Sequence, residues 1–198
     1  MSKRVLIKAC GVFVMLTLVC GILYTGVVTV LAQALFPNQA NGSIIKINGI
    51  NYGCSWLGQN YTQPGHMWGR ITNLDTSTFK DDKGNILVYA GPSNLSPNSK
   101  KYATLVEERV HAIQVANPDM KNTPIPEDLV TCSGSGLDPE ISPAAAEYQV
   151  LRIAKATGKT PNDIRTIISK CTTGRFLGLI GEPRVNVLKV NLMLDGVM

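Results

Sequence analysis

The sequence has few charged residues, few aromatic residues and almost no histidine. Of its 198 residues, 17% are charged and 6% aromatic, and the two histidines are His66 and His111. Soluble domains usually carry about 25% charged residues. The 44% of hydrophobic residues excludes a disordered chain. A mean hydropathy of +0.08 is too low for a polytopic membrane protein and high for a fully soluble one, so the hydrophobic residues must be concentrated in one part of the chain.

Short motifs that mark common active sites are also missing. The sequence contains no GxSxG, HExxH or DxDxDG pattern, and neither histidine has a metal-ligand spacing. Gly158-Lys159-Thr160 resembles the end of a phosphate-binding loop, but the first glycine of that motif would fall at Ile153. We therefore expect no metal site and no catalytic constellation in this chain. An anchored hydrolase is the disfavoured enzyme alternative, because it needs a nucleophile and a base that meet only in space.

The five cysteines contain no CxxC pair, which argues against a zinc site and a redox dithiol. Cys54, Cys132 and Cys171 are widely spaced in the second part of the chain. One disulfide among these three and free buried thiols remain alternative expectations.

One long apolar run is present at the start of the chain. Residues 9–35 include no charged side chain, and these 27 residues exceed the roughly 20 that a helix needs to cross a bilayer. A cleaved signal sequence is the alternative, since Ala32-Gln33-Ala34 resembles a cleavage site, but the apolar part of such signals is usually about 7–15 residues long. We expect a retained transmembrane helix over 9–35 and a folded domain over 36–198.

The cations around this run predict its orientation. Lys3, Arg4 and Lys8 precede it, and the next cation is Lys46. The positive-inside rule then places residues 1–8 in the cytoplasm and residues 36–198 outside it. Without the three leading cations, 16 basic and 14 acidic residues remain, a net charge of +2. A domain so close to neutrality gives little support for nucleic-acid binding.

Small and hydroxylated residues recur at every fourth position of the predicted span. The set is Thr17, Gly21, Thr25, Thr29 and Gln33. Residues at this spacing lie on one ridge of a helix, where small side chains allow a second membrane helix to approach closely and Gln33 can donate a hydrogen bond across. The alternative is that this spacing arises by chance, because Gly and Thr are common in membrane anchors. We favour docking against a partner helix in the bilayer.

Residues 36–198 mix short strand patterns with about three helices, which predicts an extracytoplasmic α+β domain. We expect a hairpin or a bent strand around Asn48-Gly49, strands at 55–59 and 85–89, and a loop over 60–83. The alternation of apolar residues over 188–194 predicts a final strand.

Helices are predicted at 100–116, over 144–157 and from Pro161 onward. Ser142-Pro143 and Thr160-Pro161 supply N-cap residues and first-turn prolines for the last two.

The candidate site begins at Ser133-Gly134-Ser135-Gly136. Glycines permit positive φ and close backbone approach, so successive amides could form an anion site ahead of the helix that starts at Ser142. The alternative, which we favour, is a tight structural loop in which Asp138 and Ser142 accept hydrogen bonds from local amides.

Two further polar groups could serve either binding or structure. Gln149 and Arg152 are three residues apart and share a helix face with alanines, which suits a binding surface or a capped interface. Glu182, Arg184 and Asn186 precede the last predicted strand. An internal ion pair between Glu182 and Arg184 is the more ordinary use of that pair.

Several blocks of the sequence occur together in one known family. They are SGSGLDPEISPAAA at 133–146, QVLR at 149–152, GEPRVNVL at 181–188 and NLMLD at 191–195, with Gly58-Gln59 and GPSN at 91–94. With the single N-terminal span, they closely resemble KdpC, the C subunit of the bacterial high-affinity, ATP-driven potassium-transport complex. The resemblance implies an inner-membrane protein whose partners are a channel-like K+-translocating subunit, a P-type ATPase subunit and a small membrane subunit.

The resemblance implies two alternative roles. In the first, the chain is a non-catalytic accessory subunit without a cofactor that stabilises the complex over the channel-like subunit. In the second, it is a catalytic chaperone that binds ATP and raises the ATP affinity of the ATPase subunit, with the helix around Gln149 in contact with the nucleotide. Because ATP is cytoplasmic and the flanking cations place Gln149 outside, we favour the first.

Overall fold

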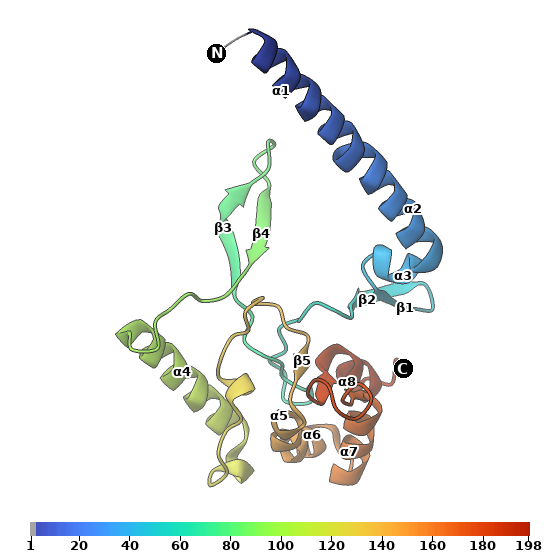
Figure 1. Ribbon diagram of the computed structural model, residues 1–198. Helices are drawn as coiled ribbons and strands as arrows, with labels where there is room; N and C mark the ends of the chain where they lie inside the picture. Colours follow the sequence, from blue (N-terminus) through green and yellow to red (C-terminus); the bar gives the residue numbers. More distant parts are fainter. Residues whose placement is uncertain (1–2) are drawn as a thin grey trace. The chain divides into compact units, whose positions relative to one another are not determined.

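The computed structural model describes residues 3–198; residues 1 and 2 of the predicted cytoplasmic segment 1–8 lie outside the described part. The chain separates into two compact units, which meet between Ile44 and Ile45 (Figure 1). The first unit is helical, and the second combines helices with short strands.

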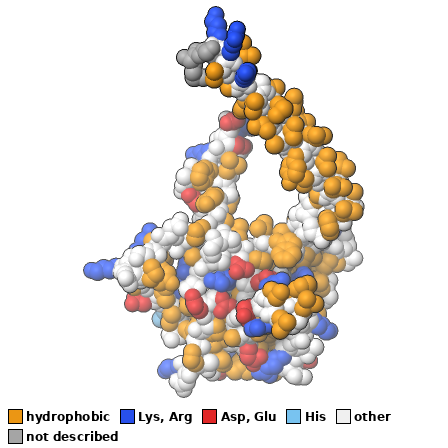
Figure 2. Space-filling view, in the orientation of Figure 1, with side chains coloured by type: hydrophobic (Ala, Val, Ile, Leu, Met, Phe, Trp, Pro, Cys, Tyr) orange, Lys and Arg blue, Asp and Glu red, His pale blue; other side chains and the backbone are white. Residues whose placement is uncertain are grey.

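The first unit is a helix long and apolar enough to cross a membrane. It runs from Lys3 to Leu35 through α1 (Lys3–Leu16), the π-helical stretch η1 (Thr17–Tyr24) and α2 (Thr25–Leu35), and the short α3 (Pro37–Ala40) follows. The helix has no buried residue among those described, and Figure 2 shows apolar side chains over its length. Such a surface is favourable in lipid and costly in water. One N-terminal apolar helix followed by an α+β domain confirms the predicted fold class.

Threonine hydroxyls support the π-helical stretch at both ends. Thr17 Oγ1 donates to the carbonyl of Phe13 at 2.9 Å, and Thr25 Oγ1 donates to the carbonyl of Cys20 at 3.1 Å. Wide π turns misalign backbone groups, which would be expensive in a hydrocarbon solvent. The hydroxyls therefore supply donors where the widened helix needs them.

The second unit contains three small sheets within residues 45–198 and the neighbouring Ile44. Its strands are β1 (Ile44–Ile47), β2 (Ile50–Cys54), β3 (Leu74–Lys80), β4 (Ile86–Ala90), β5 (Glu140–Ile141), β6 (Thr172–Thr173) and β7 (Arg184–Asn186). Its helices are α4 (Lys100–Ala116), α5 (Pro143–Tyr148), α6 (Val150–Thr157), α7 (Pro161–Lys170) and α8 (Val187–Leu194), with 3-10 turns η2 (Pro118–Met120) and η3 (Glu127–Leu129). β1 pairs with β2, β3 pairs antiparallel with β4, and the third sheet is antiparallel in the order β5-β7-β6.

The core of the second unit lies among α5 to α8 and the sheet β5-β7-β6. Ile153 of α6, Ile164 of α7, Val185 of β7 and Val190 of α8 have no exposed surface. α7 is held at its start by a capping box, in which Thr160 accepts from the amide of Asp163 and the Asp163 carboxylate accepts from the amide of Thr160. Burial of these aliphatic faces stabilises the helices, which are too short to be stable alone.

Residues 187–194 form a helix, so the predicted final strand is wrong. The Asn186 side chain accepts from the amide of Lys189 at 3.0 Å and caps α8. Within α8 only Lys189 and Met193 are not buried. These two are four residues apart, a helical spacing, so the apparent alternation came from an almost wholly buried helix.

Other expectations differ in the parts with weak periodicity. Residues 55–59 form no strand, and β3 lies inside the predicted loop 60–83. In β3 the Asp75 carboxylate accepts from the amides of Ser77 and Thr78, and the register with β4 shifts between Asp75 and Phe79. This irregularity hides the two-residue period in the sequence. The hairpin around Asn48-Gly49, the helix at 100–116 and the helix from Pro161 are confirmed.

Candidate functional site

Gln149 lies inside the domain and interrupts the predicted helix 144–157, which is split into α5 and α6. Its side chain is 0% exposed. Oε1 accepts from the amide of Trp68 at 2.8 Å and from Arg152 at 2.6 Å. Nε2 donates to the carbonyls of Trp68 at 3.0 Å and Ala145 at 3.1 Å. Every polar atom of Gln149 is therefore used within the domain.

Arg152 is the centre of the same buried network. Its Nε donates to Asn117 Oδ1 at 3.1 Å, and its Nη1 donates to the carbonyls of Pro64 and, at 3.0 Å, His66. The guanidinium also lies over the Trp68 ring, 4.5 Å from the centroid. Burial lowers the pKa of Arg152 to about 10, which leaves it charged at neutral pH. Arg152 therefore clamps the loop before Trp68 against α6.

A second buried amide completes this attachment. Asn191 of α8 accepts from the amide of Met67 at 2.7 Å and donates to the carbonyl of Met67 at 3.0 Å. Gln149 makes the same pair of bonds to Trp68. Two side-chain amides thus bond both backbone groups of adjacent residues, as a neighbouring strand would. The segment that leads into β3 is fixed to the core by these bonds.

Residues 133–136, which we call the glycine loop, hold the root of the β3–β4 hairpin. Gly136 has φ +71°, and a Cβ on it would lie 2.4 Å from the carbonyl oxygen of Gly91. The amide of Asn73 donates to the carbonyl of Gly136 at 2.9 Å, and Asn73 Nδ2 donates to the carbonyl of Gly91 at 2.8 Å. Glycine is needed at 136 because both the backbone conformation and the close approach exclude a side chain.

Side chains within and next to the loop 133–142 accept hydrogen bonds from several of its amides. Ser133 Oγ accepts from the amide of Gly136 at 3.0 Å, and Ser135 Oγ accepts from the amide of Leu137 at 3.2 Å. Asp138 accepts from the amide of Glu140, and Ser142 accepts from the amide of Ala145. Gly134 is exposed and makes no close approach to another segment. These local bonds are those expected of a tight structural loop.

A cleft of about 380 Å³ beside this loop is lined mainly by carboxylates. They come from Glu127, Asp128, Asp138, Glu140 and Glu182, against the two cations Arg70 and Arg184. An acidic lining repels a triphosphate, and Gln149 does not reach the surface. Among the residues proposed for nucleotide contact, Gln149 and Arg152 are therefore used inside the domain, and Asp138 lines this acidic cleft. Within residues 3–198, no three His, Cys, Asp or Glu side chains are grouped to hold a metal ion.

The predicted ion pair between Glu182 and Arg184 is wrong. Arg184 of β7 instead bonds Glu140 of β5 at 2.7 Å, because the two are diagonal neighbours on one face of the sheet. Glu182 pairs with Arg175 at 2.8 Å. Burial raises the pKa of Glu140, and Arg184 counters only part of this shift. Asn186 caps α8 and donates to the carbonyl of Ser55 at 2.9 Å.

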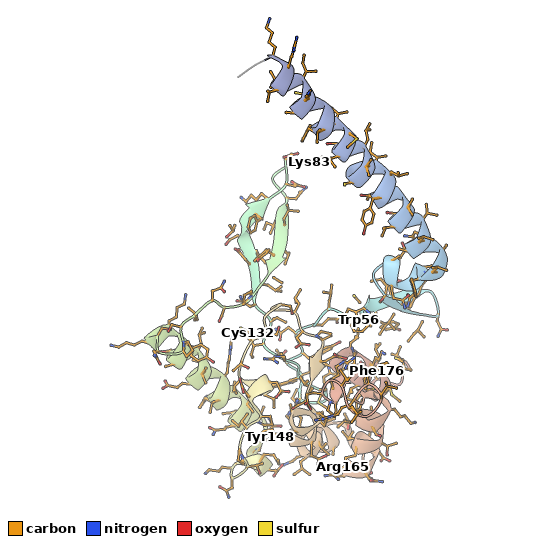
Figure 3. The ribbon with its side chains drawn as sticks, viewed as in Figure 1. Trp56, Lys83, Cys132, Tyr148, Arg165 and Phe176 are labelled. Atoms are coloured by element: carbon orange, nitrogen blue, oxygen red, sulfur yellow. The ribbon has the colours of Figure 1, made fainter. Side chains whose placement is uncertain are left out.

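The β3–β4 hairpin carries a large apolar surface outside the core. Its exposed residues are 47–62% accessible and comprise Leu74, Phe79, Ile86, Leu87, Val88 and Tyr89. Figure 1 shows the two strands extending away from the helices of the same unit, with Lys83 at the tip in Figure 3. A two-stranded sheet is only marginally stable in water by itself. Ile86 and Val88 alternate with Leu87 and Tyr89 along β4, so both faces of the hairpin carry apolar side chains. Exposed apolar surface of this kind marks an interaction site.

In the first unit, the ridge Thr17, Gly21, Thr25, Thr29 and Gln33 has no buried member. Gln33 is exposed, and its Oε1 accepts from Asn41 Nδ2 at 3.0 Å. The amide expected to bond a partner helix thus also fixes the corner between α2 and α3. The cysteines among the described residues are free thiols.

Sequence reasoning missed Trp68, Asn117 and Asn191 of the buried network and the exposed hairpin. Asn191 stands alone as a polar residue in an apolar stretch, which is the pattern that could have found it. The hairpin gave no comparable pattern, because β3 consists mostly of Asp, Ser and Thr.

Comparison with known proteins gives a consistent result over nearly the whole chain. The family described as K+-transporting ATPase, c chain (KdpC) matches residues 6–196. The chain is 53% identical to a potassium-transporting ATPase KdpC subunit of Clostridium botulinum strain Eklund 17B, over 99% of this chain and 98% of that protein. The identity is 52% to the subunit of Clostridium perfringens, over 98% of each chain, and 46% to that of Burkholderia orbicola, over 92% and 91%. The chain therefore belongs to the KdpC family, the c chain of K+-transporting ATPases.

Proposed function

We propose that this chain is a non-catalytic accessory subunit of an ATP-driven K+ uptake complex, which it stabilises by docking on its membrane partners. The expected partners are the channel-like K+-translocating subunit, the P-type ATPase subunit and the small membrane subunit. The observation that carries the proposal is the β3–β4 hairpin, which is rigidly rooted yet exposes six large apolar side chains. A surface that is ordered before binding loses little entropy on docking.

The chain offers a matched pair of variants to test this docking. Val88 on β4 is 62% exposed and Val115 on α4 is 67% exposed. Val88→Glu should reduce copurification of the other subunits, because it places a charge in an apolar contact. Val115→Glu should leave it unchanged. Equal yields of the complex with both variants would remove the hairpin from the interface.

Docking in the bilayer is proposed along the ridge of small residues. Gly21→Leu and Thr25→Leu together would fill the groove that a partner helix needs, whereas Gly11→Leu adds the same bulk away from the ridge. We expect the double variant to lower recovery of the complex in detergent and Gly11→Leu to have little effect. Undiminished recovery of the double variant would remove the ridge from the interface.

We further propose that the first unit crosses the bacterial inner membrane with Lys3, Arg4 and Lys8 in the cytoplasm. Residues 36–198 then lie outside, over the outer mouth of the channel-like subunit. Protease added to cells whose outer envelope has been opened should trim the second unit without lysis. Cleavage only after lysis would place the domain inside and reverse the topology.

A further inference from the structure

The connection between β6 and β7 presents four large apolar side chains to solvent. They are Phe176, Leu177, Leu179 and Ile180, each 65–80% exposed. The turn is ordered by its own backbone: the amide of Phe176 donates to the carbonyl of Ile180 at 2.8 Å, and the amide of Ile180 returns the bond at 3.0 Å. Arg175 and Glu182 close its base at 2.8 Å. We call residues 176–180 the apolar turn.

Leu177 occupies a strained position in this turn. Its φ is 52°, in the left-handed region that favours glycine or asparagine. A leucine there strains the backbone, and at 78% exposure its side chain gains almost no burial in the domain. The hydrogen bonds of the turn hold this conformation, and they keep the Leu177 side chain directed away from the domain. An ordered turn with four exposed apolar side chains is typical of a contact surface.

Cations and a tryptophan lie beside the apolar turn. The strands that carry it, β6 and β7, line a pocket of about 120 Å³ together with Trp56, Lys170 and Lys189. Trp56 and Leu57 are exposed, and Figure 3 labels Trp56 and Phe176. Arg184 in this pocket is paired with Glu140. Neither lysine makes an ion pair with a carboxylate among the described residues, so no carboxylate of the domain competes with a ligand for them.

We propose that the apolar turn, Trp56, Lys170 and Lys189 form a second membrane contact, which docks on the anionic lipid surface next to the transmembrane helix. Phe and Leu side chains would enter the headgroup boundary, Trp56 would lie at the interface, and the lysines would meet headgroup phosphates. Indole at the interface with cations beside an apolar tip is typical of such binding.

The length of the tether supports a lipid surface as the occupant. Eight residues, 36–43, separate Leu35 of the span from Ile44 of β1, and this connection can extend over no more than about 30 Å. The start of the second unit is therefore tethered within that distance of the end of the span. The hairpin is a poorer lipid contact because Asp81 and Asp82 at its tip balance the charges of Lys80 and Lys83, so an anionic surface does not attract it. The inference thus goes beyond the docking of partner subunits.

Fluorescence of the full-length chain in lipid vesicles tests this contact without any partner subunit. An environment-sensitive dye is attached at Leu177→Cys in a cysteine-free background, and Asn162→Cys at the start of α7 serves as the exposed control. The vesicles consist of phosphatidylcholine alone or with phosphatidylglycerol, and each set is repeated with brominated lipids. We expect the dye at 177, but not at 162, to shift to shorter wavelength and to be quenched when phosphatidylglycerol is present.

Charge variants separate the lysines from general electrostatics. Neutralising Lys170 or Lys189 to Gln should lower the ratio of inserted to exposed turn roughly fivefold for each. Lys155→Gln in the last turn of α6 and Lys159→Gln just after this helix should not change the ratio. A dye at 177 that stays water-like in both vesicles would overturn the proposal. A shift of the dye at 177 to shorter wavelength that appears only when the other subunits are added would assign this face to a protein partner. That result would also overturn the proposal.

Discussion

The interior around Arg152 and the β3–β4 hairpin use their side chains in opposite ways. The interior buries polar groups, among them Gln149, Arg152 and Asn191, and satisfies them with backbone partners from the segment at 63–68. The hairpin exposes apolar groups and has few contacts of its own beyond the pair Phe79–Tyr89, whose ring centroids are 5.5 Å apart. Buried polar networks fix one conformation, whereas exposed apolar strands are typical of a surface that binds a partner.

The difference separates stability from assembly within one domain. Changes in the interior should alter the free energy of unfolding, and changes on the hairpin should alter binding alone. Gly136 connects the two regions, because it brings the glycine loop close to the backbone of Asn73 and Gly91 at the hairpin root. Substitutions in these regions can therefore be ranked by their expected effect on folding.

The largest effect is expected from Arg152→Ala. It leaves Asn117, Gln149 and the carbonyl of His66 buried without their charged donor. We expect a loss of roughly 3–5 kcal/mol in the free energy of unfolding. Urea titration of the full chain in detergent, followed by tryptophan fluorescence, measures this loss. Arg165→Ala, which breaks an exposed ion pair with Glu147, is the control and should cost far less. Equal losses would mean that the buried network is not the main support.

Gly136→Ala should have the next largest effect. The added Cβ would collide with the carbonyl of Gly91 and favour a negative φ, so we expect a loss of roughly 1–3 kcal/mol. Gly134→Ala is the matched control, because nothing lies within 4 Å of its Cβ position. Hydrogen exchange should show faster exchange in β3 and β4 for Gly136→Ala only. Unchanged exchange in the hairpin would mean that the glycine loop does not hold its root.

A smaller, pH-dependent effect is expected at Glu140. Burial raises its pKa in the folded state, so the protonated form is favoured by folding. The stability that this group contributes is present below the ordinary glutamate pKa and is lost as the pH rises through the folded-state pKa. Wild type should therefore lose stability relative to Glu140→Gln as the pH rises above the ordinary glutamate pKa of about 4. The opposite trend would show that the Arg184 ion pair outweighs burial.

The smallest effect on folding is expected from Val88→Glu, the variant that should weaken assembly most. Val88 is exposed in the free chain, so we expect its free energy of unfolding to change by no more than about 0.5 kcal/mol. Thermal unfolding of the isolated full-length chain measures this. A large loss would mean that the hairpin stabilises the domain itself, and the separation of the two regions would fail.

Elements with a strong local pattern were predictable from the sequence. The apolar run, the Asn48-Gly49 turn and the capped helix from Pro161 each depend on neighbouring residues, and the structure has them at the expected places. Helix α8 was misread because burial on almost all sides removes the amphipathic period that distinguishes a helix from a strand. β3 was missed because its bulge and its polar residues leave no alternation to read.

The candidate residues were found, but their surroundings were not. Gln149 and Arg152 read as surface groups among alanines, because nothing local reveals that Trp68 and Asn117 cover them from distant segments. In the same way, Arg184 pairs with Glu140 through a sheet register that sequence spacing does not show. Long-range pairing decides which polar residues are buried, and one sequence alone carries little information about it.

The π-helical stretch has a geometric consequence for the membrane helix. In an α-helix, residues four apart are offset by about 40° around the axis, so four such steps from Thr17 to Gln33 would turn by about 160°. The wider turns of Thr17–Tyr24 need more residues to complete a circle, so the first two steps rotate the other way. The opposed rotations largely cancel, so the ridge from Thr17 to Gln33 stays on one side of the helix, where a neighbouring helix can contact both of its ends.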